Sequence, residues 1–338
     1  MGGPDSAMRC RLLKFAAPVA LLCASSLAAH AISCTTQSKM TPRQRTDYEQ
    51  ASQALAQEIA AGNTTAVRAA TISSVAVHFD AIASTISQAS SLIQKATLTI
   101  DNIYSLNATD LKAGDQAQFF CGLSGSSLLV TLTIPQLPPG NYVLAIIDAT
   151  GVEQPQRLSM ILQNDPSGSS QWKLAGLFVR PLTIAGRDGV WYWRKARDFA
   201  QSKQNLDAFF YYQTARSLLD PVDFLSSPNL EKLQNEMQDV RPPDLPGTNP
   251  LVVSASGLNL EVTGLRTDAF QGNLDLVVDY KAQDVSGPVA TREQILELMK
   301  AMLSRYPQLR PAFHGLWVYA YNSSGQPFAI EQTMNQIP

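Results

Sequence analysis

Apolar positions divide the first part of the chain into helices. Between residues 41 and 93 they recur at steps of three, four or seven, the spacing of one face of an α-helix. Leu55 and Ile59 mark a first helix, which Gly62-Asn63 ends. A second helix carries the stripe Val75, Phe79, Ile82, Ile86 and Ile93. Both apolar stripes are interpreted as faces that point into a core.

From Lys95 onward the apolar period changes to two, which is the spacing of half-buried β-strands. Turn-forming residues separate successive strands, most clearly at Pro138-Pro139-Gly140-Asn141. The predicted strands are 97–100, 119–121, 128–132, 142–148, 157–163 and 171–180. Helices followed by a run of antiparallel strands predict an α+β domain over residues 42–181.

The order of these elements, with a closing strand at residues 172–177, resembles the cone-shaped fold of nuclear-transport-factor-like and cystatin-like domains. The resemblance covers residues 42–181 and concerns topology, without a shared motif. It implies a concave sheet that binds a small ligand or a partner chain. The enzymes among such domains use an inward Asp–His pair, and the sequence nominates none. His78, beside the helix residue Phe79, is interpreted as a structural or surface histidine.

Residues 188–240 follow a helical pattern again. Trp191-Tyr192-Trp193 opens a helix, a second helix runs from Ala208 to Leu219, and a third runs from Asn229 to Asp239. The spacing of small and aromatic residues resembles a tetratricopeptide helical hairpin; these residues are Ala196, Phe199, Ala208, Tyr212 and Ala215, with Pro221 after them. Because about three such units are needed for an independent array, this single unit is expected to pack on its neighbours.

The aromatic run Trp191, Tyr192 and Trp193 is the candidate interaction site. Two interpretations stay open for it: the rings grip a ligand or partner, or they fill the core of the helical hairpin, and core packing is favoured. The stretch 223–230 also resembles bacterial exported proteins of uncharacterised activity.

Residues 241–250 form a predicted linker, because four prolines in ten positions prevent a helix or a central strand. A C-terminal α+β sandwich is predicted for residues 251–338. Its strand 273–281 alternates apolar and polar residues, and Thr291 with Gln294 is predicted to form the capping box of a helix. A hairpin of strands 313–321 and 328–333 is predicted to follow.

The first 34 residues have the pattern of an export signal. Arg9, Arg11 and Lys14 form a positive region, the stretch 15–24 is apolar, and small residues follow. Ten apolar residues are too few for a bilayer span, which takes about 20. Translation starts at Met1 or at Met8, with Met8 favoured because Asp5 fits the signal poorly. The mature protein is predicted to be exported.

Two cleavage sites compete in this leader. Ala29-His30-Ala31 fits ordinary signal peptidase, whereas residues 31–34 resemble a bacterial lipobox with Cys34 as the acylated residue. The lipoprotein is favoured, with the outer membrane as its location and the lipid as its membrane contact. In that case Cys121 is a buried strand cysteine. The alternative is a Cys34–Cys121 disulfide formed in an oxidising periplasm.

Composition narrows the possible functions. A chain of 338 residues with 45% apolar residues suggests about two or three globular domains. The leader carries three basic residues and one acidic residue, so its removal takes the formal charge from −2 to −4. This balance argues against a basic nucleic-acid-binding surface and against electrostatic adhesion to anionic lipid.

Signatures of catalysis are absent from the sequence: it has no G-x-S-x-G elbow, no glycine-rich phosphate loop, no C-x-x-C and no H-E-x-x-H. After the leader only His78 and His314 remain, neither with a visible companion, so no metal and no cofactor are predicted. Asp275 and Asp279 share a strand face. They are interpreted either as a cation site or as solvated carboxylates, and the second interpretation is favoured.

These observations predict a non-enzymatic envelope protein that acts as an adaptor toward a protein partner and binds no nucleic acid. The alternative function is small-ligand binding or hydrolysis on the concave sheet of the first domain.

Overall fold

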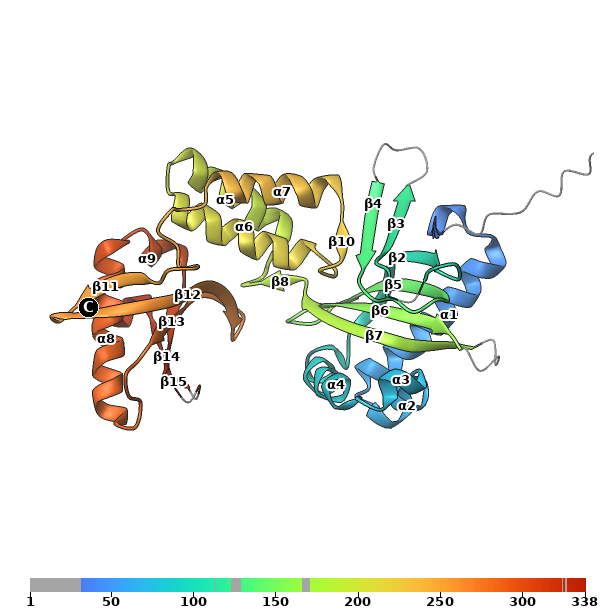
Figure 1. The fold of residues 1–338 in the computed structure, drawn as a ribbon, viewed down its shortest axis with the longest axis horizontal. Helices are drawn as coiled ribbons and strands as arrows, with labels where there is room; N and C mark the ends of the chain where they lie inside the picture. The colour runs from blue at the N-terminus through green and yellow to red at the C-terminus, as the bar shows by residue number, and fades with distance from the viewer. Residues whose placement is uncertain (1–31, 113, 123–128, 166–170, 324, 326) are drawn as a thin grey trace, which may run out of the picture. The chain divides into compact units, whose positions relative to one another are not determined.

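The N-terminal part of the protein combines helices with a five-stranded sheet (Figure 1). The computed structural model describes residues 32–112, 114–122, 129–165, 171–323, 325 and 327–338. Most of the predicted leader therefore lies outside the described residues. The helices are α1 (Pro42–Ala60), α2 (Thr64–Ala69), α3 (Ser73–Ala76) and α4 (Asp80–Ile93). The main sheet is antiparallel, in the order β1 (Ser33–Thr36), β2 (Thr97–Asn107), β5 (Asn141–Thr150), β6 (Gln156–Asn164) and β7 (Trp172–Pro181).

Local signals explain where these helices begin. Thr41 and Gln44 form a reciprocal capping box at the start of α1, and the Asn63 side chain accepts a hydrogen bond from Ala66 N at the start of α2. The predicted helical region is thereby confirmed. The second predicted helix is divided into α3 and α4, and it keeps Phe79 and Ile86 in the core.

Both faces of the main sheet are covered by apolar side chains. On one face, Val143 and Ile147 of β5 pack with α1 and α4. On the other face, Leu144 and Ile146 pack with a smaller sheet in the order β10-β4-β3. Its strands are β3 (Ala117–Gly122), β4 (Leu129–Ile134) and β10 (Leu225–Ser226). The alternation read from the sequence thus places successive β5 residues in two different cores.

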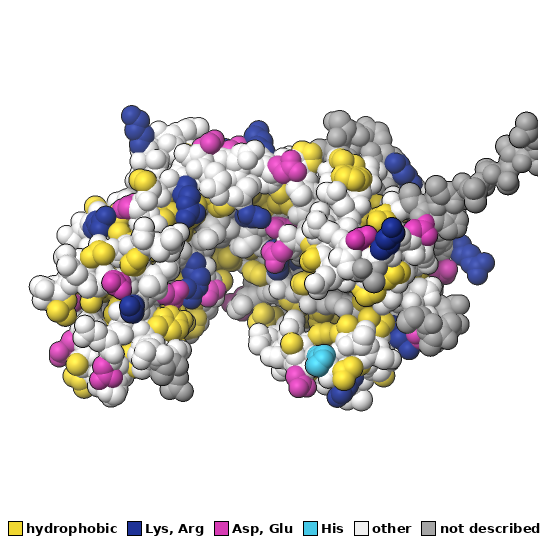
Figure 2. Space-filling model, in the orientation of Figure 1, with side chains coloured by type: hydrophobic (Ala, Val, Ile, Leu, Met, Phe, Trp, Pro, Cys, Tyr) yellow, Lys and Arg dark blue, Asp and Glu magenta, His cyan; other side chains and the backbone are white. Residues whose placement is uncertain are grey.

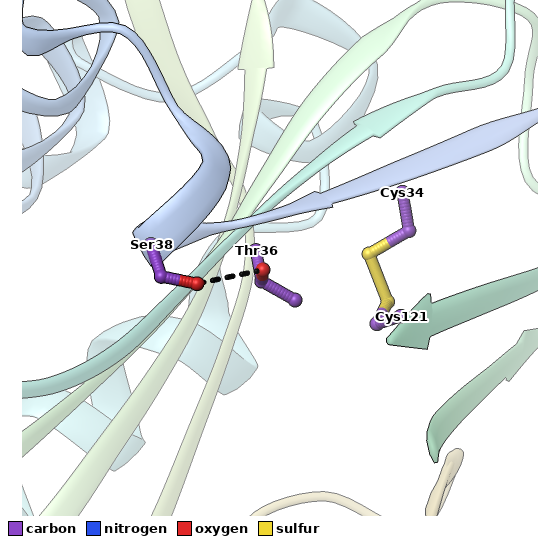
Figure 3. The surroundings of a disulfide bond; sticks show 4 residues. All are labelled: Cys34, Thr36, Ser38 and Cys121. Atoms are coloured by element: carbon purple, nitrogen blue, oxygen red, sulfur yellow. Dashed lines mark hydrogen bonds between the residues drawn. A yellow bond between two sulfur atoms is a disulfide. The ribbon is translucent and has the colours of Figure 1, made fainter. Parts of the chain in front are cut away.

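A disulfide joins Cys34 of β1 to Cys121 of β3 (Figure 3). The bond connects the edge of the main sheet to the smaller sheet across 87 residues of sequence. The structure therefore corrects the favoured assignment of the two cysteines: Cys121 is buried but is not a free thiol. A sulfur in this bond cannot also carry the thioether of a lipid anchor, so the bonded form excludes acylation of Cys34.

The predicted helical segment is present as three helices. A small hairpin of β8 (Thr183–Ile184) and β9 (Arg187–Asp188) leads into them. The helices are α5 (Gly189–Gln201), α6 (Asn205–Leu219) and α7 (Pro228–Asp239). Helix α6 begins three residues earlier than predicted and is buried around most of its circumference. The β10 strand between α6 and α7 pairs with β4, which ties this segment to the N-terminal part.

The C-terminal part is a five-stranded sheet with α8 (Pro288–Arg305) along it (Figure 1). The strands lie in the order β11 (Leu251–Ala255), β12 (Leu258–Phe270), β13 (Asn273–Lys281), β14 (Gly315–Tyr321) and β15 (Pro327–Thr333); α9 (Leu309–Ala312) precedes β14. Because α8 crosses over between them, β13 and β14 are parallel, whereas the other neighbours are antiparallel. The predicted order of strands, helix and strands is confirmed, and the chain has an α+β fold.

The predicted capping box of α8 is wrong. The helix begins at Pro288, so Thr291 lies inside its first turn and its hydroxyl donates to the Gly287 carbonyl. Proline at the first helical position needs no hydrogen bond from its missing N–H, and this allows the earlier start.

The predicted linker 241–250 contains neither helix nor strand. It is nevertheless held in place, because Asp244 accepts hydrogen bonds from Arg305 and Tyr306 at the end of α8. The helical segment and the C-terminal sheet also share one apolar core, in which Phe210 of α6 meets Phe313. None of the described helices combines the length and the hydropathy that crossing a bilayer requires.

Candidate functional site

The three aromatic residues singled out in the sequence hold the helical segment together. Tyr192 is 2% exposed and donates a hydrogen bond to the Ile184 carbonyl, so its ring cannot meet a partner. Trp191 is half-buried and packs edge-on against Tyr192. Trp193 is also half-buried, and its Nε1 donates to Glu236 of α7. The run therefore brings together α5, the β8–β9 hairpin and α7, as the core-packing interpretation proposed.

Glu236 anchors this arrangement. Its carboxylate accepts two hydrogen bonds from Arg197, at 2.8 and 2.7 Å, besides the one from Trp193. Burial alone would raise the pKa of Glu236, but the hydrogen bonds from Arg197 and Trp193 outweigh burial and lower it. The carboxylate thus stays ionised and paired, and the site is structural.

A second group of aromatic side chains lies on the C-terminal sheet. We call it the outer aromatic face; it comprises Phe270, Trp317, Tyr319 and Tyr321 with the ion pair Arg266–Asp279. Strand alternation explains the grouping, since odd-numbered residues of β14 point to one side and even-numbered ones to the other. The even-numbered residues Leu316, Val318 and Ala320 are buried in the core with α8.

The rings of the outer aromatic face form a continuous ladder. Trp317 and Tyr319 stack at 6.0 Å between ring centroids, Tyr319 and Tyr321 stack at 6.2 Å, and Phe270 meets Trp317 edge-on at 4.7 Å. The Arg266 guanidinium lies 5.8 Å from the centre of the Tyr319 ring. All four rings are partly exposed, so this face presents aromatic surface to solvent.

The Trp317 indole nitrogen is buried, although the ring is partly exposed. Its Nε1 has no hydrogen-bond partner within the described residues. Because this nitrogen is itself buried, only the exposed part of the Trp317 ring contributes to the outer aromatic face.

Beside the ladder, the structure joins a histidine to two carboxylates. His314 Nδ1 lies 3.0 Å from Asp275 Oδ1, and Glu331 of β15 completes a group whose ligand atoms all lie within 4.8 Å of one another. The expectation that His314 has no companion is therefore wrong. The favoured interpretation of Asp275 as a solvated carboxylate is also wrong, because its side chain is 0% exposed. Asp279, on the same strand face, pairs instead with Arg266.

The chemistry available to this group is limited. An aspartate that holds an imidazole is one half of a nucleophilic site, but no hydroxyl or thiol of the described residues hydrogen-bonds to the His314 ring. One imidazole nitrogen and two carboxylates are, in contrast, a common donor set for a divalent cation. Asp275 and His314 are 39 residues apart in sequence, and only the parallel pairing of β13 with β14 brings them together.

The other residues considered from the sequence form no site. His78 is exposed, at the turn between α3 and α4. In the face drawn in Figure 2, the Lys and Arg side chains are scattered among Asp and Glu and do not gather into one basic field.

Comparisons with known proteins add no identity: no family model, no curated protein and no solved structure matches this chain.

Proposed function

We propose that this protein is exported to the cell envelope and acts there as a non-enzymatic adaptor that binds a protein partner through the outer aromatic face. The observation that carries the proposal is the ladder Trp317-Tyr319-Tyr321, half-exposed and accompanied by Arg266. Trp, Tyr and Arg are the residues that most often dominate the binding energy of protein interfaces. Their rings supply large contact areas and lose little conformational entropy on binding.

The N-terminal part supports this choice over a ligand pocket or a hydrolase. A concave sheet that binds a ligand needs polar groups converging on a cavity. Here both faces of the central strand β5 are lined by apolar side chains that pack against other elements. Packing of both faces of β5 thus favours the adaptor over a ligand site on the concave sheet.

Export is supported by the leader and by the disulfide. The positive and apolar stretches precede a chain whose two remaining cysteines are bonded to each other. Such bonds persist in oxidising compartments outside the cytoplasm.

The proposal is tested with single substitutions in the full exported chain. Tyr319→Ala removes the central ring of the ladder, and Val289→Ala is the matched control, since Val289 is an exposed apolar residue of α8 in the same domain. Affinity for a partner recovered from the native envelope and then purified is measured for each variant.

Truncation of a dominant contact costs at least about 2 kcal/mol, which corresponds to a roughly 30-fold weaker Kd. We expect this loss for Tyr319→Ala and no loss for Val289→Ala. Equal affinities for wild type and Tyr319→Ala would contradict the assignment of this face. Saturable binding of an oligosaccharide in place of a protein would overturn the choice of partner.

A further inference from the structure

The carboxylates of Asp275 and Glu331 converge over a residue that has no side chain. A Cβ added to Gly315 would lie 2.9 Å from the Gln332 carbonyl oxygen, 3.2 Å from Glu331 Oε1 and 3.3 Å from Asp275 Oδ1. Gly315 does not have a positive φ, so the backbone conformation does not demand glycine there. The absent side chain lets the Gln332 carbonyl approach closely, and it leaves a space that carboxylate oxygens border from β13 and β15, the strands on either side of β14.

The negative charges around this space exceed the positive ones. Asp275 is completely buried, His314 is its only ion-pair partner within the described residues, and its Oδ2 has no hydrogen-bond partner there. Glu331 forms no ion pair with a Lys or Arg in the described part of the chain. Two carboxylates this close repel each other unless a positive charge lies between them, and a buried carboxylate without full compensation is costly.

We propose that Asp275, His314 and Glu331 form a binding site for one divalent transition-metal ion of the Zn²⁺ type. The site goes beyond the adaptor function and does not depend on it. Zn²⁺ takes imidazole nitrogen and carboxylate oxygen at about 2.0–2.2 Å, which places the ligand atoms of a tetrahedral site about 3.3 Å apart. His314 Nδ1 and Asp275 Oδ1 lie 3.0 Å apart, joined by a hydrogen bond, and all three ligand atoms lie within 4.8 Å of one another, so an ion would draw them together. Two carboxylates and a neutral imidazole match the charge of the ion.

The backbone holds these ligands before any ion arrives. His314 N donates to the Leu274 carbonyl, and the His314 carbonyl accepts from Met334 N, so the residue is fixed on both sides. Asp275 on β13 and Glu331 on β15 lie on the two strands that pair with β14 from either side. The His314 side chain is 40% exposed, which gives the ion a route from solvent. With three protein ligands, the fourth position is left for water or for a group of the partner.

The proposal is tested by calorimetric titration of Zn²⁺ into the oxidised chain after removal of any affinity tag. The same chain is titrated with Co²⁺, whose visible absorption reports nitrogen and oxygen coordination. Variants His314→Ala and Glu331→Gln each remove one ligand, and Asp275→Asn neutralises the buried one. The controls are His78→Ala, an exposed histidine, and Asp279→Asn, a carboxylate on the same strand face.

We expect one Zn²⁺ per chain, a rise in Tm with Zn²⁺, and at least about tenfold weaker binding in each ligand variant, with both controls unchanged. If Asp275→Asn does not fold, as judged by circular dichroism, His314→Ala and Glu331→Gln decide the matter.

Three results would overturn the proposal. They are wild-type affinity no greater than that of His314→Ala, loss of binding in a control variant, and Ca²⁺ binding as tight as Zn²⁺ binding and indifferent to His314. The last result would indicate a general acidic surface, because Ca²⁺ is bound by oxygen ligands.

Discussion

Breaking the bond between Cys34 and Cys121 should loosen the N-terminal part and leave the C-terminal part unchanged. Among the described strands, β1 lies at the edge of the main sheet and pairs with β2 alone, and the disulfide is its covalent connection to β3. Cys34→Ala removes the bond at its half-buried end and leaves the buried Cys121 side chain in place. The loss of the cross-link is therefore the main effect of the substitution.

The loss of folding free energy can be worked out from the length of the loop that the bond closes. For a sequence separation of 87 residues, the chain-entropy model gives roughly 4–5 kcal/mol, and measured values are usually about 2–4 kcal/mol. A loss of that size in a domain of this length corresponds to a fall in Tm of roughly 5–15 °C.

Hydrogen exchange of the wild-type and Cys34→Ala chains measures the effect element by element. Amides of β1, β2 and β3 should exchange faster in the variant, and those of β13 and β14 should not, because neither cysteine contributes to the C-terminal core. Wild type treated with a reductant should behave like the variant. Unchanged protection in β1–β3, or alkylation of both thiols in the exported chain, would refute the reasoning.

Two further predictions concern α6 and its neighbours. Asp207 is buried with both carboxylate oxygens unpaired within the described residues, and burial raises its pKa to about 6. The folded chain therefore binds the proton more tightly than the unfolded chain. The free energy of unfolding should then fall by about 2–3 kcal/mol as the pH rises from 4 to 7. Urea unfolding should show that Asp207→Asn abolishes most of this pH dependence of stability. An equal pH dependence in the variant would contradict the assignment to Asp207. A Cβ at Gly189 would lie 2.6 Å from Leu219 Cγ, so Gly189→Ala should cost about 1–3 kcal/mol in the same assay. Gly247→Ala, which meets nothing within 4 Å, should be neutral, and equal effects at the two glycines would count against close packing of α5 on α6.

Periodicity predicted the elements of this protein well, because each depends on the burial of one face. The α1 stripe and the even-numbered residues of β13 lie in cores as expected. The other face of β13 was expected to be solvated, but Asp275 and Val277 on it are buried. The sequence predicts the wrong start for α8, because Thr291 and Gln294 match a capping box, whereas the helix begins at Pro288, three residues earlier.

The sites could be predicted less well, because they depend on which strands become neighbours. The alternating aromatic residues of β14 are visible in the sequence. In a sandwich with both faces of the sheet covered, however, these rings would all be buried, so the sequence did not mark them as a surface. Only the structure shows that α8 covers one face. The Asp275–His314 pair was missed because it requires parallel pairing across α8, although a strand–helix–strand order is itself a signal of such pairing. For Cys34, the sequence alone could not decide between a lipid-modified cysteine and a disulfide bond with Cys121.

Site-specific photo-crosslinking in living cells tests the adaptor proposal most directly. A photoreactive amino acid is placed at Tyr321, on the outer aromatic face, and for comparison at Val289 on α8 and at Trp191 in the helical segment. The account predicts a discrete protein adduct from position 321, and it predicts that Tyr319→Ala diminishes this adduct. Adducts of equal yield from all three positions, or an adduct from position 191 alone, would contradict it.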